Sequence, residues 1–507
     1  MHLPHLWSHW YLRAQIMLNS SVHKTYFLKK FRHHSTLYWR SYCSSASSSS
    51  LSHTEASQRC TSTNFVLLRR ALTSQFIIPE FQKFTSKIDD IYWECKSIHS
   101  GKVATYIPQL SRYSPDYWAV SICTIDGQRH SIGDFNVPFC LQSGAKPLAY
   151  AMAVNELGSD LVHQYVGQEP SGQAFNSLVL DANNKPHNPM INAGALAVTS
   201  LLKNDLLLSD RFEYFNVQAK RLGGQEEVGF HNPTFLSERA TADRNRAIGW
   251  FMKENKCFPE GINLEETLDF YFQCCSVEVT CMSASVIAAS IANGGICPTT
   301  GDKVLSAESV RNTLSLMYSC GMYDYSGQFA FKVGLPAKSG VSGCVLLIIP
   351  NVMGVCLWSP PLDHLGNSVR AVNFCERLVA KFNFHNYDNL RHNQTKTDPR
   401  KRILESNINQ IASGIYAAFN NDTKYLLRQH RSGGDLSQGD YDQRTALHVA
   451  ASEGHLEAVS FLIETGKCSP DKRDRWGRKP LHDAVSFGHN EVAEYLRQYT
   501  TQDGEDE

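Results

Sequence analysis

The decapeptide Leu141-Gln-Ser-Gly-Ala-Lys-Pro-Leu-Ala-Tyr150 contains a serine and a lysine three residues apart. On one turn of helix, residues at this spacing lie on the same face, with Cβ atoms roughly 5 to 6 Å apart. Ser143 and Lys146 would therefore place a hydroxyl nucleophile beside an amine base. The spacing alone is a weak signal, because it recurs at Ser21/Lys24, Ser200/Lys203 and Ser469/Lys472.

A second element strengthens this pair. Lys338-Ser-Gly340 occurs once in the chain and precedes the apolar run 345–349. The combination S-x-x-K plus K-[ST]-G is typical of penicillin-recognising serine hydrolases, where a strand with Lys-Ser-Gly can lie beside the serine's helix. The alternative is a solvated Ser/Lys pair at a helix start. Together, the two motifs favour catalysis.

Length and composition restrict the class of protein. A chain of 507 residues suggests two to four domains. The formal net charge of zero indicates no general affinity for nucleic acid. The fifteen cysteines include no C-x-x-C pair, which predicts reduced, buried thiols in an intracellular compartment and no metal site. No apolar run approaches the roughly 20 residues that cross a bilayer, so we expect a soluble protein without a membrane span.

Residues 1–54 contain no Asp or Glu, carry six Lys and Arg residues and end in the serine-rich run Ser44–Ser52. Basic, serine-rich and acid-free sequence is typical of a mitochondrial transit peptide. The alternative is a disordered basic leader. We therefore expect a mitochondrial matrix protein, with the cytosol as the fallback location.

The next part of the chain predicts an α/β domain. Residues 55–100 indicate a short helical segment, and 101–384 form the candidate catalytic domain. Alternating residues predict a hairpin over 117–124 and 128–132, closed at Asp126-Gly127, and a second over 345–349 and 352–358. Residues 282–292 indicate a buried helix that ends at Gly294-Gly295. A hairpin followed directly by the Ser143 helix would set a sheet against that helix.

Several polar and aromatic residues of this domain are unremarkable when taken singly. Asn192 suits a helix cap or a turn. Glu238 and the charged residues 243–245 suggest a solvated cluster at a helix start. Tyr271 would be a core aromatic residue, and Tyr323 lies in a Gly-flanked loop.

The C-terminal part repeats itself. Thr445-Ala-Leu-His448 recurs as Lys479-Pro-Leu-His482, close to the ankyrin pattern T-P-L-H-x-A and its period of about 33 residues. An earlier, degenerate copy is plausible at 415–428. We predict a linker over 385–404, all-α ankyrin repeats over 405–499 and an acidic tail over 500–507. Such repeats bind protein partners or pack on a neighbouring domain, and the sequence does not identify the partner.

The chain from about residue 64 to 499 resembles the animal glutaminases of the kidney and liver types, which carry C-terminal ankyrin repeats. The resemblance implies a β-lactamase/penicillin-binding-protein-like α/β (α+β) catalytic domain that hydrolyses L-glutamine to L-glutamate and ammonia. The stretches that carry it are Gly101–Leu110, Val137–Ser143, Lys185–Ala195, Phe270–Phe272, Ser319–Tyr323 and Gly334–Val341.

The resemblance also implies roles for individual residues. Ser143 would be the nucleophile and Lys146 its base, with the backbone N–H groups of Ser143 and Val341 as the oxyanion hole. Either Tyr271 or Tyr323 could relay protons, and the sequence does not choose between them. No metal or cofactor is implied. The residues expected to bind glutamine are Tyr106, Gln142, Ser143, Asn192, Glu238, Asn245, Tyr271, Tyr323 and Val341.

Two departures from the family pattern bear on assembly. Of the helical domain that precedes the catalytic part in the long animal forms, only the last segment, about residues 60–100, is recognisable. In the stretch Ser171–Leu180, which aligns with the family's loop near the subunit interface, Ser177 replaces a lysine. A homotetramer is implied by resemblance, and inorganic phosphate is a possible activator.

Two other functions remain open at this point. The first is a β-lactam or D-Ala-D-Ala hydrolase with the same Ser/Lys pair, although Glu238 and the paired Asn residues suit an amino-acid zwitterion better. The second is a scaffold with a vestigial catalytic domain, which the presence of Ser143, Lys146 and Tyr323 disfavours.

Overall fold

The computed structural model describes residues 76–388, 396–401 and 403–501. The predicted leader 1–54 lies outside the described residues, as do residues 502–507 of the predicted tail. Residues 77–401 are called the sheet unit below, and residues 403–501 the repeat unit. Each unit is described by itself.

A five-stranded sheet organises the sheet unit, with strand order β2-β1-β8-β7-β6 and antiparallel neighbours throughout. Both predicted hairpins are present: Ala119 pairs with Gly133 in the first, and Cys344 pairs with Trp358 in the second. The strands are β1 (Ala119–Thr124), β2 (Arg129–Gly133), β6 (Ala337–Ser339), β7 (Cys344–Ile349) and β8 (Met353–Trp358).

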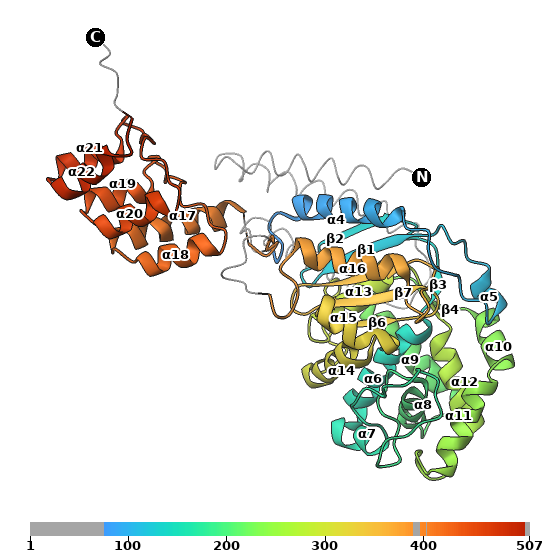
Figure 1. Ribbon diagram of the computed structural model, residues 1–507. Helices are drawn as coiled ribbons and strands as arrows, with labels where there is room; N and C mark the ends of the chain where they lie inside the picture. Colours follow the sequence, from blue (N-terminus) through green and yellow to red (C-terminus); the bar gives the residue numbers. More distant parts are fainter. Residues whose placement is uncertain (1–75, 389–395, 402, 502–507) are drawn as a thin grey trace, which may run out of the picture. The chain divides into compact units, whose positions relative to one another are not determined.

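Helices cover both faces of this sheet (Figure 1). Because successive side chains of a strand point to opposite faces, Val345 and Leu347 of β7 join one core with helices α4 (Phe81–Lys96) and α16 (Val369–Lys381). Leu346 and Ile348 join a second core on the other face. The helices of that core are α6 (Lys146–Leu157), α9 (Leu208–Leu222), α13 (Cys281–Ala292) and α14 (Ala307–Cys320).

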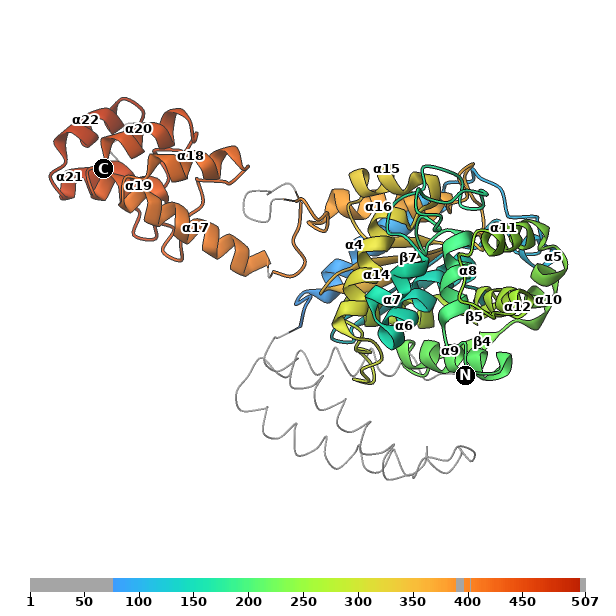
Figure 2. The same cartoon turned by 90° about the horizontal axis from the view of Figure 1, so that it is seen from below.

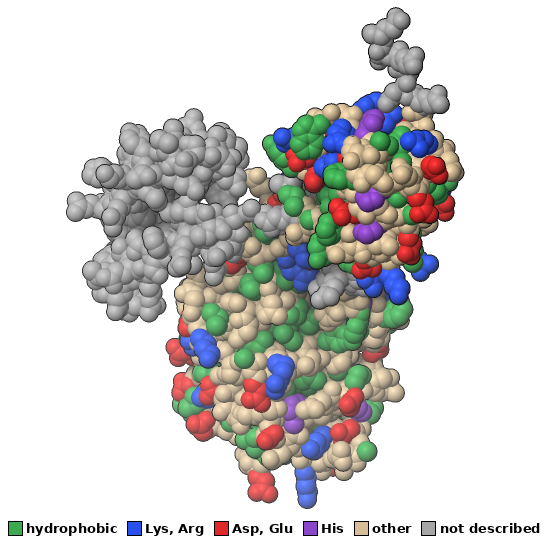
Figure 3. Space-filling model, turned by 90° about the vertical axis from the view of Figure 1, so that its left-hand side faces the viewer, with side chains coloured by type: hydrophobic (Ala, Val, Ile, Leu, Met, Phe, Trp, Pro, Cys, Tyr) green, Lys and Arg blue, Asp and Glu red, His purple; other side chains and the backbone are tan. Residues whose placement is uncertain are grey.

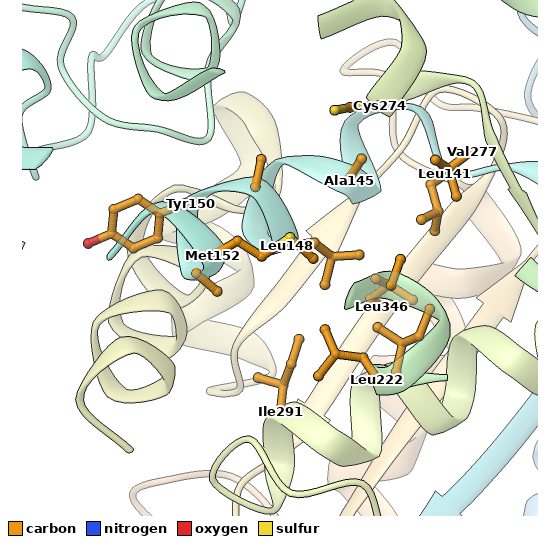
Figure 4. Packing of buried hydrophobic residues seen from close by; sticks show 14 of the residues in the cluster. Leu141, Ala145, Leu148, Tyr150, Met152, Leu222, Cys274, Val277, Ile291 and Leu346 are labelled. Carbon is orange, nitrogen blue, oxygen red and sulfur yellow. The ribbon is translucent and has the colours of Figure 1, made fainter. Parts of the chain in front are cut away.

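Helix α6, the predicted catalytic helix, packs in the second core. Leu148 of α6, Leu346 of β7 and Leu222 of α9 gather there, with Ile291 of α13 beside them (Figure 4). Every residue of α6 from Lys146 to Val154 is buried. The start of α6 is therefore packed into the core that covers one face of the sheet, as the hairpin and helix motifs predicted.

A smaller sheet and a group of helices complete the sheet unit. The small sheet has the order β3-β5-β4 and was not predicted from the sequence. Helix α8 packs against α6, α11 and α12, and Figures 1 and 2 both show it beside α6. The bounds are β3 (Phe139–Cys140), β4 (Val228–Phe230), β5 (Val277–Val279), α5 (Pro108–Ser111), α7 (Ser159–Tyr165), α8 (Asn192–Leu201), α10 (Asn232–Ala240), α11 (Asp243–Glu254), α12 (Leu264–Cys275) and α15 (Ser326–Lys332).

Part of the predicted linker 385–404 is attached to the sheet unit. The Thr397 amide donates to the Lys381 carbonyl at 3.0 Å, and Lys87 Nζ donates to Thr397 Oγ1 at 3.1 Å. Lys396 forms an ion pair with Asp388 at 2.7 Å. Residues 396–397 therefore belong to the packed domain, which the polar composition of this stretch did not indicate.

The repeat unit contains three helix pairs, as the repeat pattern predicted. Thr445 and His448 cap α19 reciprocally, and the buried His448 ring also bonds the Arg478 carbonyl of the next repeat at 3.1 Å. His489 Nε2 lies 2.9 Å from the Ser452 carbonyl in the same way. The helices are α17 (Ile403–Phe419), α18 (Thr423–Arg431), α19 (Ala446–Ser452), α20 (Leu456–Glu464), α21 (Pro480–Ser486) and α22 (Asn490–Arg497).

The surface carries both signs of charge, interspersed on the face shown in Figure 3. All thirteen cysteines in the described residues are buried free thiols, as predicted. Among those residues, no helix has the length and apolar character needed to cross a bilayer.

Candidate active site

Ser143 lies in a 3-10 turn, η1 (Gln142–Ala145), between strand β3 and helix α6. Gln142 enters the turn with φ +51°, a left-handed conformation that a non-glycine residue adopts at an energetic cost. This sharp turn brings Ser143 to the N-terminus of α6, where Lys146 Nζ donates to Ser143 Oγ at 3.1 Å. The two residues of the opening motif are therefore in hydrogen-bond contact.

Lys146 is only 3% exposed although it carries an amine. Burial lowers the pKa of this amine to about 8. Its place in the first turn of α6 acts in the same direction, because the positive end of the helix dipole disfavours a cation. Near pH 8, a substantial fraction of Lys146 is thus neutral and able to accept a proton.

Asn192, Asn245 and Tyr271 form a polar chain beside Lys146. Asn192 Oδ1 accepts from Lys146 Nζ at 2.6 Å and from the Tyr271 hydroxyl at 3.3 Å, while Asn192 Nδ2 donates to Asn245 Oδ1 at 2.9 Å. Asn192 is the first residue of α8, and Gly194 lets that helix approach the Asn188 carbonyl, which a Cβ would meet at 1.8 Å. The simple helix-cap interpretation of Asn192 is therefore wrong.

Glu238 is 7% exposed, so its assignment to a solvated charge cluster is also wrong. Its carboxylate accepts from the Tyr106 hydroxyl at 2.6 Å, and the same hydroxyl lies 3.2 Å from Gln142 Oε1. Burial raises the pKa of Glu238, and the Tyr106 hydrogen bond opposes that shift. The neighbouring Arg239 does face solvent, where it pairs with Asp269.

Tyr323 has the second left-handed backbone at the site, with φ +54°. Its hydroxyl is buried and has no hydrogen-bond partner among the described residues. Burial raises the pKa of this phenol, and an interaction with Ser143 opposes the shift. The Phe175 ring packs on Tyr323, with centroids 4.8 Å apart. The expected loop is thus a short 3-10 turn, η2 (Tyr323–Tyr325), that places this hydroxyl near enough to Ser143 to interact with it.

Strand β6 brings the second motif to the same place. Gly340 lies against the serine turn so closely that a Cβ would meet the Leu141 carbonyl oxygen at 2.6 Å. The backbone N–H groups of Ser143 and Val341 have no backbone acceptor among the described residues. Two free donors thus lie on segments that touch one another, as an oxyanion hole requires.

Lys338 was used as a motif residue and was not predicted to act at the site. It is fully buried, with its amine 4.5 Å from the centroid of the Tyr323 ring. The unique Lys-Ser-Gly sequence was the signal that could have placed it there. All ten predicted site residues and Lys338 therefore gather in one region of the sheet unit, most of them buried, with Tyr106 49% exposed at its edge.

Comparisons with known proteins agree with this arrangement. The family model described as Glutaminase matches residues 101–387, and a model described as Ankyrin repeats (3 copies) matches residues 415–506. The "Glutaminase liver isoform, mitochondrial" of Mus musculus is 55% identical over 90% of this chain and 75% of its own length. "Putative glutaminase 2" of Caenorhabditis elegans is 52% identical over 87% of this chain and 73% of its own.

Solved structures give the same result. "Probable glutaminase ybaS" superposes with a TM-score of 0.57 and 33% identity, over 61% of this chain and 99% of that one. The native form of Mglu has a TM-score of 0.57 and 37% identity, over 60% of this chain and 73% of that one. The expected β-lactamase-like fold is confirmed, and the matched family covers the whole set of site residues. The chain belongs to the glutaminase family.

Proposed function

We propose that this glutaminase, which hydrolyses L-glutamine to L-glutamate and ammonia, works through a glutamyl ester on Ser143. Lys146 would take the proton from Ser143 Oγ as the oxygen attacks the side-chain amide carbon of glutamine. The observation that carries this proposal is the 3.1 Å contact between Lys146 Nζ and Ser143 Oγ, made by a buried amine whose pKa is lowered to about 8.

The attack produces a tetrahedral intermediate with a negatively charged oxygen. The N–H groups of Ser143 and Val341 would bind that oxygen, and each such donor contributes roughly 3 to 4 kcal/mol. As the intermediate collapses, the carbon–nitrogen bond breaks, the leaving nitrogen takes the proton back, and ammonia departs. A water molecule then attacks the ester, which returns the proton to Ser143 and releases glutamate.

Tyr323 is the better candidate for the proton relay that the sequence left open. Its hydroxyl has no hydrogen-bond partner among the described residues and interacts with Ser143, whereas the Tyr271 hydroxyl is bonded to Asn192. Tyr323 could therefore pass the proton between Lys146 and the leaving nitrogen. We assign Tyr271 to holding Asn192 beside Lys146.

Recognition of the α-ammonium and α-carboxylate groups of glutamine would use residues other than Ser143 and Lys146. The Glu238 carboxylate suits the α-ammonium group of the substrate, and the Tyr106 hydroxyl, which also lies 3.2 Å from Gln142 Oε1, holds that carboxylate in place. The Asn245 amide suits the α-carboxylate. Asn192 would orient Asn245, since its own Nδ2 is already bonded there. A substrate without these charged groups would leave buried polar groups unpaired, which can cost about 10⁴-fold in kcat/KM.

The direct test replaces Ser143 with Ala in the full chain. We expect ammonia release to fall by at least about 10³-fold, with circular dichroism and melting temperature unchanged, because only one buried hydroxyl is removed. Glutamine and asparagine are compared as substrates in the parent protein. Turnover by the variant at the parent rate would mean that Ser143 forms no ester.

We also propose a homotetramer in the mitochondrial matrix, made from a precursor whose residues 1–54 are a transit peptide. Two relatives, from mouse and rat, are named mitochondrial, which supports the location. Leu178 and Val179, exposed in the stretch 171–180, support assembly through that loop. Sedimentation of the full chain with and without phosphate tests both assembly and the effect of anions where Ser177 replaces lysine. N-terminal sequencing of native protein tests the leader.

A further inference from the structure

Lys338 is a buried amine without a carboxylate partner. Its relative exposure is 0%, and its Nζ donates at 2.7 Å to the carbonyl of Ser339, its own neighbour. No ion pair joins it to an acid among the described residues. Taking an unpaired amine out of water is costly, and the proposed reaction gives this residue no role. Such a group therefore calls for an explanation at the site.

The amine faces the Tyr323 ring. Nζ lies 4.5 Å from the ring centroid, within the range in which an ammonium group is attracted to an aromatic face. A neutral amine keeps a weaker N–H contact with the same face. Tyr323 needs such support, because its left-handed backbone is unfavourable for a bulky residue and its hydroxyl has no partner.

We propose that Lys338 is a positioning residue for glutamine hydrolysis, whose amine fixes the Tyr323 ring so that the hydroxyl stays aimed at Ser143. The inference rests on the proposed function, since it assumes that Tyr323 relays a proton. Phe175 contacts the same ring and Gly366 lies under it, where a Cβ would be 3.7 Å from the ring carbons. The ring is thus held by a small set of contacts, of which Lys338 supplies the polar one.

The surroundings of Lys338 agree with a role through Tyr323. The titratable groups that affect it are Lys146 and the thiols of Cys275, Cys320 and Cys344. Burial, followed by repulsion from Lys146, holds the pKa of Lys338 well below its usual range. No acid that binds substrate is among these groups, so removal of Lys338 should leave glutamine binding intact.

The experiment is a double-mutant cycle on the full chain, with Lys338→Met, Tyr323→Phe and the double variant. We expect Lys338→Met to lower kcat by about 10- to 100-fold with KM within about 2-fold of the parent, as for loss of a proton-transfer group. The double variant should be no slower than Tyr323→Phe alone, since Lys338 acts through the hydroxyl. Lys185→Met is the control, because Lys185 Nζ also donates to a backbone carbonyl, of His163 at 3.1 Å, away from the site.

Three results would overturn the inference: a parent-like kcat for Lys338→Met, losses that multiply in the double variant, or a rise in KM that accounts for the whole effect. Should Lys338→Met fail to fold, Lys338→Gln takes its place under the same criteria. Its amide keeps an N–H donor for the Ser339 carbonyl, but its nitrogen is one atom closer to the backbone than the lysine nitrogen and so is withdrawn from the Tyr323 ring. Ser143→Ala is measured alongside. Normal glutamine turnover by Ser143→Ala rejects the proposed function itself. If Ser143→Ala is inactive but the Lys338 variant turns over glutamine at the parent rate, only the role of Lys338 is rejected.

Discussion

At the scale of single residues, surroundings and not spacing distinguish the catalytic pair. Ser200 and Lys203 share the spacing of Ser143 and Lys146, yet Ser200 bonds a carbonyl of its own helix and Lys203 pairs with Glu156 at 2.6 Å near the surface. Lys146 instead is buried, and among the described residues it forms no ion pair with an acid, although Glu238 lies near enough to oppose the lowering of its pKa. The same two residue types therefore give an ordinary surface lysine in one place and a base in the other.

The lowered pKa of Lys146 predicts how the activity depends on pH. A base must be neutral to accept a proton, so kcat/KM should rise with pH along a single ionisation near 8 and level off above it. Initial rates of ammonia release between pH 6 and 9.5, at glutamine concentrations well below KM, give this profile. A profile that is flat from pH 6.5 to 9 would exclude Lys146 as the titrating base.

The sequence predicted which residues meet at the site better than how each of them is held. Motif and resemblance brought Ser143, Lys146 and Val341 together. Glu238 was misread by composition because Arg239 beside it does face water, and only the tertiary packing of α10 separates the two. Lys338 was not predicted as a site residue, because no local sequence pattern shows that a buried amine will lie on an aromatic ring from another segment.

At the scale of elements, helix α13 packs very closely against strand β8. A Cβ on Gly354 would lie 2.0 Å from the Ala289 amide nitrogen and 2.6 Å from the Ala288 Cβ. Both contacts are far shorter than van der Waals distance, and the nearest atom is backbone. The spacing between this helix and the sheet thus depends on the absence of one side chain.

Gly354→Ala should therefore destabilise the sheet unit by about 2 to 3 kcal/mol, as overpacking of a core does. The free energy of unfolding in urea measures the effect. Gly229→Ala is the matched control in another strand, because a Cβ there would find its nearest neighbour, Glu278, only at 3.8 Å. Equal stability of the two variants would show that the helix can shift without cost.

The strands that could be predicted from the sequence were those long enough to show an alternating pattern of residues. Strands β7 and β8 have six residues each, and both hairpins were recognised from alternation and turns. Strands β3, β4 and β5 have two or three residues, too few to show a period of two. Their pairing is set by tertiary contacts between segments far apart in the sequence, and the turn that holds Ser143 depends on it.

At the scale of the whole molecule, the site and the repeats draw on separate parts of the chain. Every residue assigned to the site lies between Tyr106 and Val341, and the repeat unit has its own core (residues 417–496). Its repeats are joined by Arg444, which pairs with Asp474 at 3.2 Å and with Asp483 at 3.0 Å. Both carboxylates are buried, so this pair of contacts is a way to weaken the repeats alone.

Arg444→Ala removes the arginine that pairs with the buried Asp474 carboxylate and leaves buried Asp483 with only its longer contact to Arg478, at 3.4 Å. This loss should destabilise the repeat unit by about 2 to 3 kcal/mol. For a unit of this size we expect its melting transition to fall by roughly 10 °C, with kcat for glutamine unchanged at 25 °C. Scanning calorimetry and the ammonia assay measure the two effects on the full chain.

Arg475→Ala is the matched control for this prediction. Its guanidinium pairs with Asp442 at 2.5 Å but is half exposed, and surface pairs contribute at most about 1 kcal/mol. The control should therefore melt within about 5 °C of the parent. A loss of kcat in Arg444→Ala that is absent from Arg475→Ala, at a temperature where both repeat units are folded, would mean that the repeats control catalysis.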